Sequence, residues 1–570
     1  MKTQLTFDPG FDKLYNLYSS TEKGRELLEI EGISEKQLDV AAMSKAYFTE
    51  KLSDISIDQN ANANEQLSAN NYSAEVTKGI EKLEGEYLLW YYSKKKFGTE
   101  RANELIKAIW DGDVYFHDAS GAQIQIPYCW AYSTSIIMEK GRPYGQLHSL
   151  PPKRADSFIA QVIEVTMDLS QEFAGAISPS DMIVNYAWFA KKENLDDKTI
   201  LNDFQKFVHV VNNQFRSSGQ SPFVNISLFD RPNLRKVFDG HYYPDGTTID
   251  IEYVIRLQEI FGEWFSKGDP ATGLPYRFPV VTLNISKSDE GKIIDGNFLG
   301  WSCNVNLAKG CFNIYVNDGQ KIASCCRLVN DLERMKFRMD SFGNGGLNIG
   351  SHRVVTMNLP RVGLLSAGNM EEFDKRLLWV MEVTRDLLIV HREEILQRRI
   401  DKNFLKFFKP LNWFSLDSLF STIGILGVYE MNYFMGLDIK TKDGIAFTRY
   451  ALESIEEFAS KSSRITGNSF NVEEIPGEST APRFVKKDKA MFDLDNPFEL
   501  YSNQYIPLIA DASHPERIEL TGKFMEILSG GGILHLNIPE AITDPEIMKK
   551  LIEYCVLHGV THIAVDKFAA

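Results

Sequence analysis

The sequence is poor in cysteine, with 6 in 570 residues, and no two of them have the CxxC spacing of a common structural zinc site. So few thiols in so long a chain are typical of a reduced, cytoplasmic protein rather than of a disulfide framework. No apolar run approaches the roughly 18 residues of a membrane span. The first residues also lack the basic and apolar regions of a signal peptide. We therefore expect a cytoplasmic protein with no metal site of its own and no membrane partner.

Basic residues are also in the minority, with 62 Lys and Arg against 77 Asp and Glu, and the formal net charge is -15. This balance argues against nucleic acid as a partner, because proteins that bind its backbone carry a basic footprint. It leaves room for free nucleotides, which need only a local cluster of donors. The remaining composition, 44% hydrophobic and 24% charged, is ordinary for a protein with a large core.

Helical periodicity and β-rich runs alternate along the chain. Helices are expected at residues 73–95, 99–110, 154–176, 202–217, 376–402, 439–463 and 544–559. Strands are expected at residues 114–118, 223–228, 278–285, 312–316, 354–359, 533–538 and 561–565. This alternation predicts an α/β fold with a mostly parallel sheet. Because no repeat or long linker interrupts it, we expect one large domain over residues 60–570, preceded by a polar helical extension over residues 1–59.

Two adjacent cysteines, Cys325 and Cys326, stand directly before Arg327. Neighbouring cysteines cannot readily bridge to each other without distorting the backbone. Free cysteine is also one of the residues most often found buried. The two cysteines are therefore either structural residues buried in the core or catalytic residues. The rest of the sequence is needed to distinguish these interpretations.

The order of eight short motifs along the chain favours a catalytic role for the two cysteines. The motifs are His117-Asp118, Cys129, residues 219–225 (Gly-Gln-Ser-Pro-Phe-Val-Asn), Cys325-Cys326-Arg327, residues 358–361 (Asn-Leu-Pro-Arg), residues 423–427 (Ile-Gly-Ile-Leu-Gly), residues 476–478 (Pro-Gly-Glu) and Gly530-Gly531-Gly532. Taken singly, each of the glycine- or proline-containing segments among them is more often a turn than a site. Taken in order, they make the chain resemble the anaerobic (class III) ribonucleoside-triphosphate reductases, the glycyl-radical enzymes that make deoxynucleotides. The resemblance runs from about residue 60 to about residue 565.

The resemblance implies a fold and a set of catalytic residues. The fold would be a ten-stranded α/β barrel of two antiparallel halves, each of five parallel strands, with a finger loop through its centre. Cys326 would sit at the finger tip as a thiyl radical that takes the 3′ hydrogen of the ribose, after which the 2′ hydroxyl leaves as water. Cys129 would then supply a hydrogen atom to the 2′ carbon. Cys303, Cys311 and Cys555 match no catalytic position and are expected in the core.

Further residues are expected beside the substrate. Ser324, Cys325, Asn358 and the three glycines Gly530, Gly531 and Gly532 are the predicted substrate-binding residues, with Cys325 also suited to a structural role beside the radical residue. Residues 350–356 face the substrate in relatives, and here they include His352. An unperturbed histidine titrates near pH ~6.5, so His352 is a candidate acid–base group. An ordinary hydrogen-bonding histidine is the other interpretation.

Part of the family's pattern does not occur in these residues. The family's glycine radical lies in a segment like Arg-Val-x-Gly-Tyr after a four-cysteine zinc module, and the sequence holds neither. We expect a separate glycyl-radical polypeptide to supply the radical, generated by a radical S-adenosylmethionine activating enzyme. A truncated product and a catalytically dead copy are the alternatives. Residues 1–59 are too few and too polar for the ATP cone of many relatives.

Substrate, effectors and assembly follow from the same resemblance. Ribonucleoside triphosphates are the expected substrates, and ATP or deoxynucleotides the expected effectors, at a second site on the interface of a homodimer. Residues 153–176 are the candidate helix for that site. The electron donor, formate or a redoxin, stays open. An acyl lyase of the wider glycyl-radical group and a non-catalytic nucleotide-binding paralogue are the alternative functions. Residues 219–223 and 358–361 favour the reductase.

Overall fold

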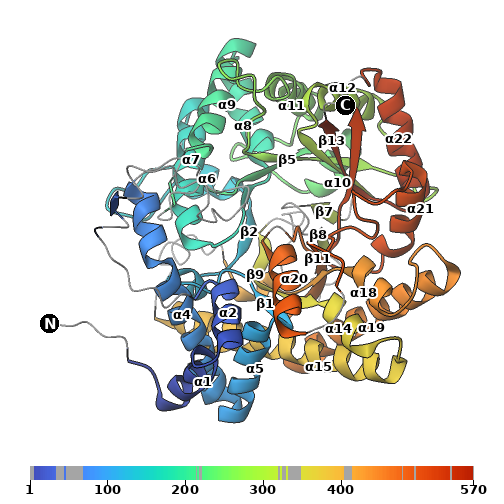
Figure 1. Ribbon diagram of the computed structural model, residues 1–570. Helices are drawn as coiled ribbons and strands as arrows, with labels where there is room; N and C mark the ends of the chain where they lie inside the picture. Colours follow the sequence, from blue (N-terminus) through green and yellow to red (C-terminus); the bar gives the residue numbers. More distant parts are fainter. Residues whose placement is uncertain are drawn as a thin grey trace.

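The computed structural model describes residues 6–33, 41, 44–45, 69–213, 215–216, 221–318, 321–323, 329–331, 348–402, 414–477, 479–492, 496–539 and 542–568. Strands form two curved sheets at the centre, and helices cover them from outside (Figure 1). None of the described helices combines the length and the apolarity that crossing a membrane requires.

The first five strands of the barrel form its first half, and they all run parallel to one another. They are β2 (Cys129–Tyr132), β3 (Ile177–Pro179), β4 (Asn225–Phe229), β5 (Val280–Ser286) and β6 (Phe312–Asn317). Parallel pairing joins β2 to β3, β4 to β5 and β5 to β6. A parallel bridge between Ile177 and Val224 connects β3 to the start of β4, so the five strands run side by side in chain order.

The second half repeats this arrangement. It consists of β9 (Ile349–Asn358), β10 (Leu419–Leu426), β11 (Phe470–Glu474), β12 (Leu534–Pro539) and β13 (His562–Phe568). Parallel pairing joins β9 to β10, β10 to β11 and β12 to β13. A parallel bridge between Glu473 and Gly531 connects β11 to the segment that leads into β12.

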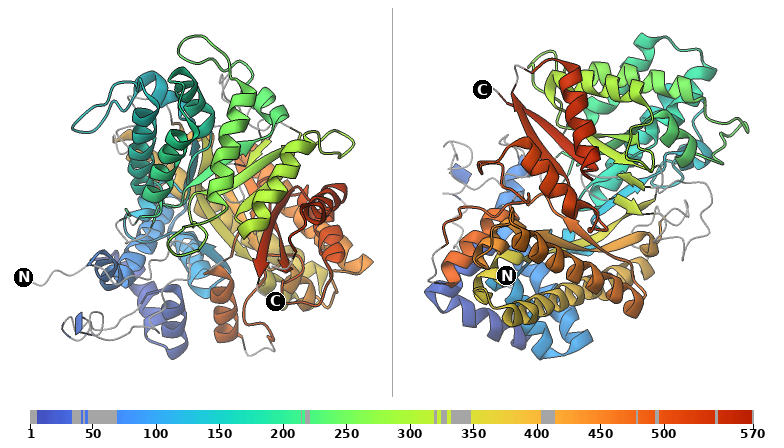
Figure 2. Two further views of the ribbon diagram at one scale, coloured as in Figure 1. Left: turned by 90° about the horizontal axis from the view of Figure 1, so that it is seen from above. Right: turned by 90° about the vertical axis from the view of Figure 1, so that its right-hand side faces the viewer.

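The two halves meet along two antiparallel seams. β2 pairs with β9, and β6 pairs with β13. Figure 2 shows β13 and α22, from the end of the chain, beside the strands of the first half. The described strands thus form a ring in the order β2-β3-β4-β5-β6-β13-β12-β11-β10-β9, five from each half. This confirms the predicted α/β barrel of two antiparallel halves. A short strand, β1 (Val114–Phe116), adds to β9 in antiparallel orientation.

Two hydrophobic cores lie between the strands and the outer helices. The core of the first half packs against α7 (Ala155–Glu172), α8 (Met182–Lys192), α9 (Asp197–Val211), α11 (Ile251–Phe265), α12 (Gly296–Lys309) and α22 (Pro545–Leu557). The core of the second half packs against α4 (Ala69–Phe97), α5 (Thr99–Asp111), α15 (Met370–Ile389) and α19 (Lys442–Thr466). α1 (Pro9–Ser19) and α2 (Glu22–Glu31) contribute to this second core, so they are packed onto the barrel. Every residue of β4, β9, β10 and β11 is buried, as expected for strands covered on both faces.

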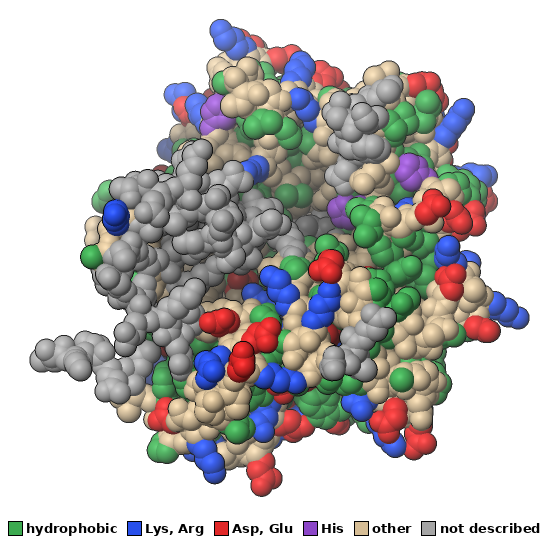
Figure 3. Space-filling model, viewed as in Figure 1, with side chains coloured by type: hydrophobic (Ala, Val, Ile, Leu, Met, Phe, Trp, Pro, Cys, Tyr) green, Lys and Arg blue, Asp and Glu red, His purple; other side chains and the backbone are tan. Residues whose placement is uncertain are grey.

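Further elements connect these layers. They are η1 (Gln123–Gln125), α6 (Ser135–Lys140), α10 (Arg231–Val237), α14 (Leu359–Ser366), the π-helical segment η2 (Val390–Leu396), α16 (Gln397–Asp401), η3 (Leu416–Ser418), α18 (Val428–Phe434), α20 (Thr480–Met491) and α21 (His514–Met525). Acidic and basic side chains are intermingled over the face drawn in Figure 3.

A hairpin follows β6 and lies between the two halves of the barrel. It consists of β7 (Lys321–Ala323) and β8 (Val329–Asp331), which pair in antiparallel orientation with Ala323 opposite Val329 (Figure 1). This is the position of the expected finger loop. The predicted residues Ser324, Cys325 and Cys326 follow Ala323 in the chain and lie outside the described residues.

Candidate active site

Cys129 begins β2 and faces the interior of the barrel. Its neighbour Trp130 belongs to the core under the outer helices, and side chains alternate between the two faces of a strand, so Cys129 points inward. It is 7% exposed and packs with Ala176, Ile349 and Phe420. Cys129 thus lies on the seam where β2 meets β9.

Ser351 is the residue of β9 directly opposite Cys129. Its hydroxyl lies 2.9 Å from the Thr422 hydroxyl on β10 and 3.1 Å from the main-chain oxygen of Arg353. Cross-strand partners share a face, so Ser351 and Cys129 present neighbouring polar side chains to the interior. Ser351 was not among the predicted site residues, although it precedes the predicted His352.

His117 lies farther along the same interior face. Its Nε2 is 2.9 Å from the Thr356 hydroxyl on β9, and the rings of Tyr115 and Tyr128 contact it edge to face. Burial, reinforced by the charge of Arg353, lowers the pKa of His117 to about 3. The imidazole is therefore uncharged near pH ~7, where one ring nitrogen can donate a hydrogen bond and the other can accept one.

His352 points toward the outer helices and forms a hydrogen-bonded chain there. Its Nε2 is 2.7 Å from the Ser421 hydroxyl, and its Nδ1 is 3.0 Å from Nδ1 of His391 in the π-helical segment. Nε2 of His391 lies 2.9 Å from the Ile124 carbonyl oxygen, which can only accept, and 3.2 Å from Nη2 of Arg353, which can only donate, so the shorter contact favours the tautomer with its hydrogen on Nε2. In that tautomer His391 Nδ1 accepts from His352 Nδ1–H, and His352 Nε2 accepts from Ser421.

Burial is the main reason why the pKa values of both His352 and His391 lie well below the usual range for histidine. Neither ring faces Cys129, and His352 is fully buried. The acid–base role predicted for His352 remains a prediction. The geometry itself favours a positioning role, in which two neutral rings join β9 and β10 to the helical layer.

Two local irregularities meet at this histidine pair. The pairing of β9 with β10 shifts register between Phe420 and Ser421, so β9 carries an extra residue there, and the facing helix carries the π-helical turn. β-bulges and π-turns both redirect side chains and are frequent at functional sites. Here the bulge sends Arg353 toward the loop between β1 and β2. Its guanidinium donates to the carbonyl oxygens of His117, Asp118, Gln123 and Ile126.

The predicted substrate residue Asn358 ends β9 and caps α14. Its Oδ1 accepts from the Arg361 main-chain N–H at 3.2 Å, and its Nδ2 donates to the carbonyl of Gly112 at 3.0 Å and to the carboxylate of Asp488 at 3.2 Å. Asp488, on α20, also accepts from Arg361 Nε at 2.6 Å and from the Tyr501 hydroxyl at 2.6 Å. The amide of Asn358 therefore joins β9, α14 and α20, and its role toward substrate stays a prediction.

The three glycines of the predicted substrate site lie on the seam between β11 and β12. Gly530 N–H donates to the Val472 carbonyl at 2.8 Å, and the Gly531 carbonyl accepts from Glu474 N–H at 3.0 Å. A Cβ on Gly530 would lie 2.7 Å from the Val472 oxygen, and one on Gly532 would lie 2.3 Å from the Glu474 carboxylate. The Val472 backbone thus explains Gly530, the Glu474 side chain crowds Gly532, and a φ of 93° suits Gly531, while their contact with substrate remains a prediction.

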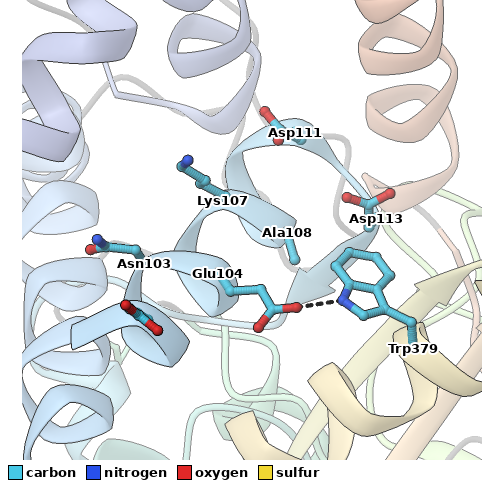
Figure 4. A pocket seen from close by; sticks show the side chains of 8 residues that line it. Asn103, Glu104, Lys107, Ala108, Asp111, Asp113 and Trp379 are labelled. Atoms are coloured by element: carbon cyan, nitrogen blue, oxygen red, sulfur yellow. Dashed lines mark hydrogen bonds between the residues drawn. The ribbon is translucent and has the colours of Figure 1, made fainter. Parts of the chain in front are cut away.

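A hollow of about 450 Å³ opens elsewhere, in the outer helical layer. It is lined by Glu100, Asn103, Glu104, Lys107, Ala108, Asp111, Asp113 and Trp379. Figure 4 shows the Glu104 carboxylate accepting the hydrogen bond of the Trp379 indole. None of the predicted site residues lines this hollow.

Among the residues that the structure describes, no group of three or more His, Cys, Asp or Glu side chains is arranged to hold a metal ion.

Comparison with known proteins finds a matching family model and a related curated protein. The family model described as "Anaerobic ribonucleoside-triphosphate reductase" matches residues 69–567. The anaerobic ribonucleoside-triphosphate reductase of Enterobacteria phage T4 is 23% identical over 427 residues, which cover 67% of this chain and 63% of that protein. The chain thus spans less than two thirds of the length of this curated relative.

Solved structures give a closer likeness. An anaerobic ribonucleotide reductase superposes with a TM-score of 0.87 and 32% identity over 100% of this chain and 89% of the other. The Thermotoga maritima enzyme in complex with dATP and CTP gives a TM-score of 0.85 and 30% identity over 99% and 92%. A glycyl radical enzyme from Archaeoglobus fulgidus, at 10% identity and a TM-score of 0.55 over 100% and 92%, shares the fold alone.

Proposed function

The chain belongs to the anaerobic ribonucleoside-triphosphate reductase family, a family of oxidoreductases, and from this premise we propose that it is the catalytic subunit that converts ribonucleoside triphosphates to 2′-deoxyribonucleotides by thiyl-radical chemistry. One observation carries the proposal. Cys129 faces the interior of the barrel on the β2–β9 seam, and the β7–β8 hairpin, which brackets Cys325 and Cys326 in the chain, lies between the same two halves.

The proposed reaction uses the two thiols in succession. Cys326, as a thiyl radical, takes the hydrogen atom from C3′ of the ribose. The 2′ hydroxyl then leaves as water with the proton of the 3′ hydroxyl, and Cys129 gives its sulfur-bound hydrogen atom to C2′, which leaves a ketone at C3′ and a thiyl radical on Cys129. One electron and one proton then return Cys129 to the thiol, and another electron and proton convert the ketone to a C3′ radical, which takes the hydrogen atom back from Cys326 and restores its thiyl radical. The overall change adds two electrons and two protons, which an external reductant supplies.

The substrate fits one end of the second half of the barrel. Strands β9, β10 and β11 are parallel, and helices α14, α18 and α20 begin beyond their carboxyl ends. Ligands of α/β proteins bind at such ends, where helix N-termini attract anions. We therefore expect the triphosphate there, with Asn358 and residues 530–532 on the same side of the ring, and Ser324 and Cys325 beside Cys326.

The remaining components are proposed from the family. The unpaired electron would come from a glycyl radical on a separate polypeptide, generated by a radical S-adenosylmethionine activating enzyme. One relative, the Thermotoga maritima enzyme, has been solved with dATP bound in its specificity site. We propose that ATP or a deoxynucleotide also controls substrate choice here, in a cytoplasmic homodimer, with α7 near that site. Residues 60–570 would form the catalytic barrel, and residues 1–59 would hold no ATP cone.

The test is anaerobic reconstitution of the intact chain with a glycyl-radical polypeptide and its activase. Deoxynucleotide formation from a ribonucleoside triphosphate and a glycyl signal in electron paramagnetic resonance are the expected results. Cys326→Ala and Cys129→Ala should each abolish turnover, whereas Cys555→Ala, in the first core, should retain it. Full activity of Cys326→Ala would refute the mechanism. A radical signal without turnover in the parent protein would favour a nucleotide-binding regulatory role.

A further inference from the structure

A glycine and a main-chain N–H hold the sulfur of Cys129. Ala176 N–H donates to Cys129 Sγ at 3.1 Å. A Cβ on Gly175 would lie 2.5 Å from the same sulfur, so no other residue fits there without moving the thiol. The segment is fixed against β2 by hydrogen bonds from Gly175 N–H to the Tyr128 carbonyl at 2.7 Å and from Trp130 N–H to the Ala176 carbonyl at 2.9 Å.

Arg216 organises this segment from behind. It is 7% exposed and donates to the carbonyl oxygens of Ser170, Phe173, Ala174 and Gly175. α7 ends at Glu172, and Phe173 is already extended, so these carbonyls lack the partners that a longer helix would provide. A cation at the C-terminus of a helix is favoured by the helix dipole as well. The guanidinium therefore sets the path of the chain from the end of α7 to Ala176.

We infer that Arg216 is a positioning residue for Cys129, which acts by holding the turn after α7 so that Ala176 N–H meets the sulfur. Because Ala176 N–H occupies one lone pair of Sγ, the S–H bond points in a direction other than toward Ala176. Transfer of a hydrogen atom depends on that direction, since reactivity falls steeply with misplacement of the reacting atoms. The catalytic consequence rests on the proposed function, whereas the geometric arrangement does not.

The charge of Arg216 supports the same role. No carboxylate in the described part of the chain forms an ion pair with Arg216, whose partners there are all carbonyls. Burial lowers the pKa of Arg216, and the nearby charge of Asp118 opposes this by favouring the charged guanidinium. A buried arginine that binds only carbonyls is costly unless its hydrogen bonds are satisfied, so the turn and the arginine stabilise each other.

The experiment measures alkylation of Cys129 by iodoacetamide in the intact native chain, with each thiol followed by peptide mass spectrometry. Arg216→Met removes the donors, Arg216→Lys keeps the charge, and Gly175→Ala pushes directly on the sulfur. Arg517→Met is the matched control, because Arg517 is 6% exposed and also donates to four carbonyls, those of Ile506, Pro507, Leu508 and Ala510, on a different segment.

Alkylation of Cys129 in Arg216→Met should be about tenfold faster than in the parent, the change expected when the segment opens more easily by roughly one lost buried hydrogen bond. Arg216→Lys should be intermediate, Gly175→Ala should also change the rate, and Arg517→Met should match the parent. Cys303 and Cys555 report whether the fold survives, because both are fully buried in the first core. A parent-like rate in both Arg216→Met and Gly175→Ala would overturn the inference.

The same set of variants distinguishes an effect on the position of Cys129 from general unfolding and from loss of turnover. If Arg216→Met also exposes Cys303 and Cys555, Gly175→Ala decides, and an unchanged Cys129 rate there overturns the inference. In reconstituted enzyme, Arg216→Met should lower kcat with little change in KM, and Arg216→Lys should recover part of it. Altered alkylation in a protein that shows no reductase activity would leave the positioning role standing and refute the proposed function instead.

Discussion

Glu430, on α18, is a buried acid whose environment favours the neutral form. Its carboxylate accepts from Ser502 N–H at 2.9 Å, and Oε2 has no hydrogen-bond partner among the described residues. Burial raises the pKa of Glu430 to about 7, against the opposing effect of main-chain donors. In the unfolded chain the same acid loses its proton at about pH 4.3. Between these two values the unfolded state ionises and the folded state does not.

Glu430→Gln should therefore change how stability depends on pH. The contribution of the protonated Glu430 is fully present below about pH 4 and is lost as pH rises through about 7, because the unfolded state binds fewer protons there. Glutamine keeps the acceptor for Ser502 and lacks this loss. Urea unfolding should show Glu430→Gln gaining up to about 3 kcal/mol on the parent between pH ~5 and pH ~8. Glu290→Gln, on an exposed ion pair, should show no such trend. An equal difference at both pH values would contradict the expectation.

The two stacked histidines give a second prediction for single residues. The shorter of the two contacts at His391 Nε2 favours Nε2–H in His391 and therefore Nδ1–H in His352. Nitrogen-15 NMR of histidine-labelled protein should show these two tautomers, unchanged between about pH 5.5 and pH 7.5, because both pKa values lie well below the usual range. His391→Leu should cost about 1–3 kcal/mol by leaving the His352 donor unpaired. His391→Gln, which keeps a donor and an acceptor, should recover part of that loss. Titration of either ring within this range would contradict the assignment.

At the scale of elements, the carboxylate of Asp488 joins α20 to its neighbours. Asp488 receives hydrogen bonds from Arg361, Tyr501 and Asn358, which belong to three other segments. Asp488→Asn keeps the shape but leaves a buried guanidinium short of its counter-charge. We expect a loss of about 3 kcal/mol in urea unfolding, at the lower end of the range for a broken buried pair, because Asp113 still contacts Arg361.

The same measurement on an exposed pair is the control for Asp488. Asp156→Asn breaks the contact with Arg154 between side chains that are 46% and 68% exposed, and should change stability by less than about 0.5 kcal/mol. Hydrogen exchange should show faster exchange in α20 for Asp488→Asn alone. A change of less than about 1 kcal/mol in Asp488→Asn would mean that the pair contributes little beyond its own desolvation.

Most strands of the barrel were predictable from the sequence, including β4, β5 and β12, and several short or irregular ones were not. α5, β6 and β13 lie close to their expected ranges. β2 and β3 were missed because three or four buried residues carry no period. β10 contains Gly424, which suggested a turn, but a Cβ there would lie 2.3 Å from the Thr356 hydroxyl on β9. β9 begins at Ile349, ahead of the expected start, because the polar residues 351–353 do not resemble a strand.

The candidate site shows the same division. Cys129 was found through the order of motifs, and the structure places it on the interior of the barrel. Arg353 and Arg216 gave no signal, because their partners are main-chain carbonyls that any residue could supply. His391 could not be paired with His352 in advance, since the pairing depends on a π-turn and a β-bulge that meet in space. Backbone geometry of this kind leaves no trace in a single sequence.

At the scale of the whole molecule, the barrel ring ties both cores together, and the N-terminal helices belong to that unit. Phe11 of α1 is fully buried, and its ring contacts Trp90 and Trp110. Glu31 of α2 forms ion pairs with Lys82 at 2.8 Å and with Lys487 on α20. A ring closed by antiparallel seams at β2–β9 and β6–β13 cannot lose one half without freeing strand edges of the other.

A substitution in the N-terminal helices should therefore lower the stability of the distant first core as well. Phe11→Ala should cost about 3–5 kcal/mol, as for other aromatic side chains removed from a core. If the barrel unfolds cooperatively, the urea concentration at which Cys555 becomes alkylated should fall by the corresponding amount, although Cys555 lies in the first core and Phe11 in the second. Leu17→Ala, at a position that is 57% exposed on the same helix, should leave that concentration unchanged. Protection of Cys555 that is identical in Phe11→Ala and the parent would show that α1 and α2 unfold independently of the ring.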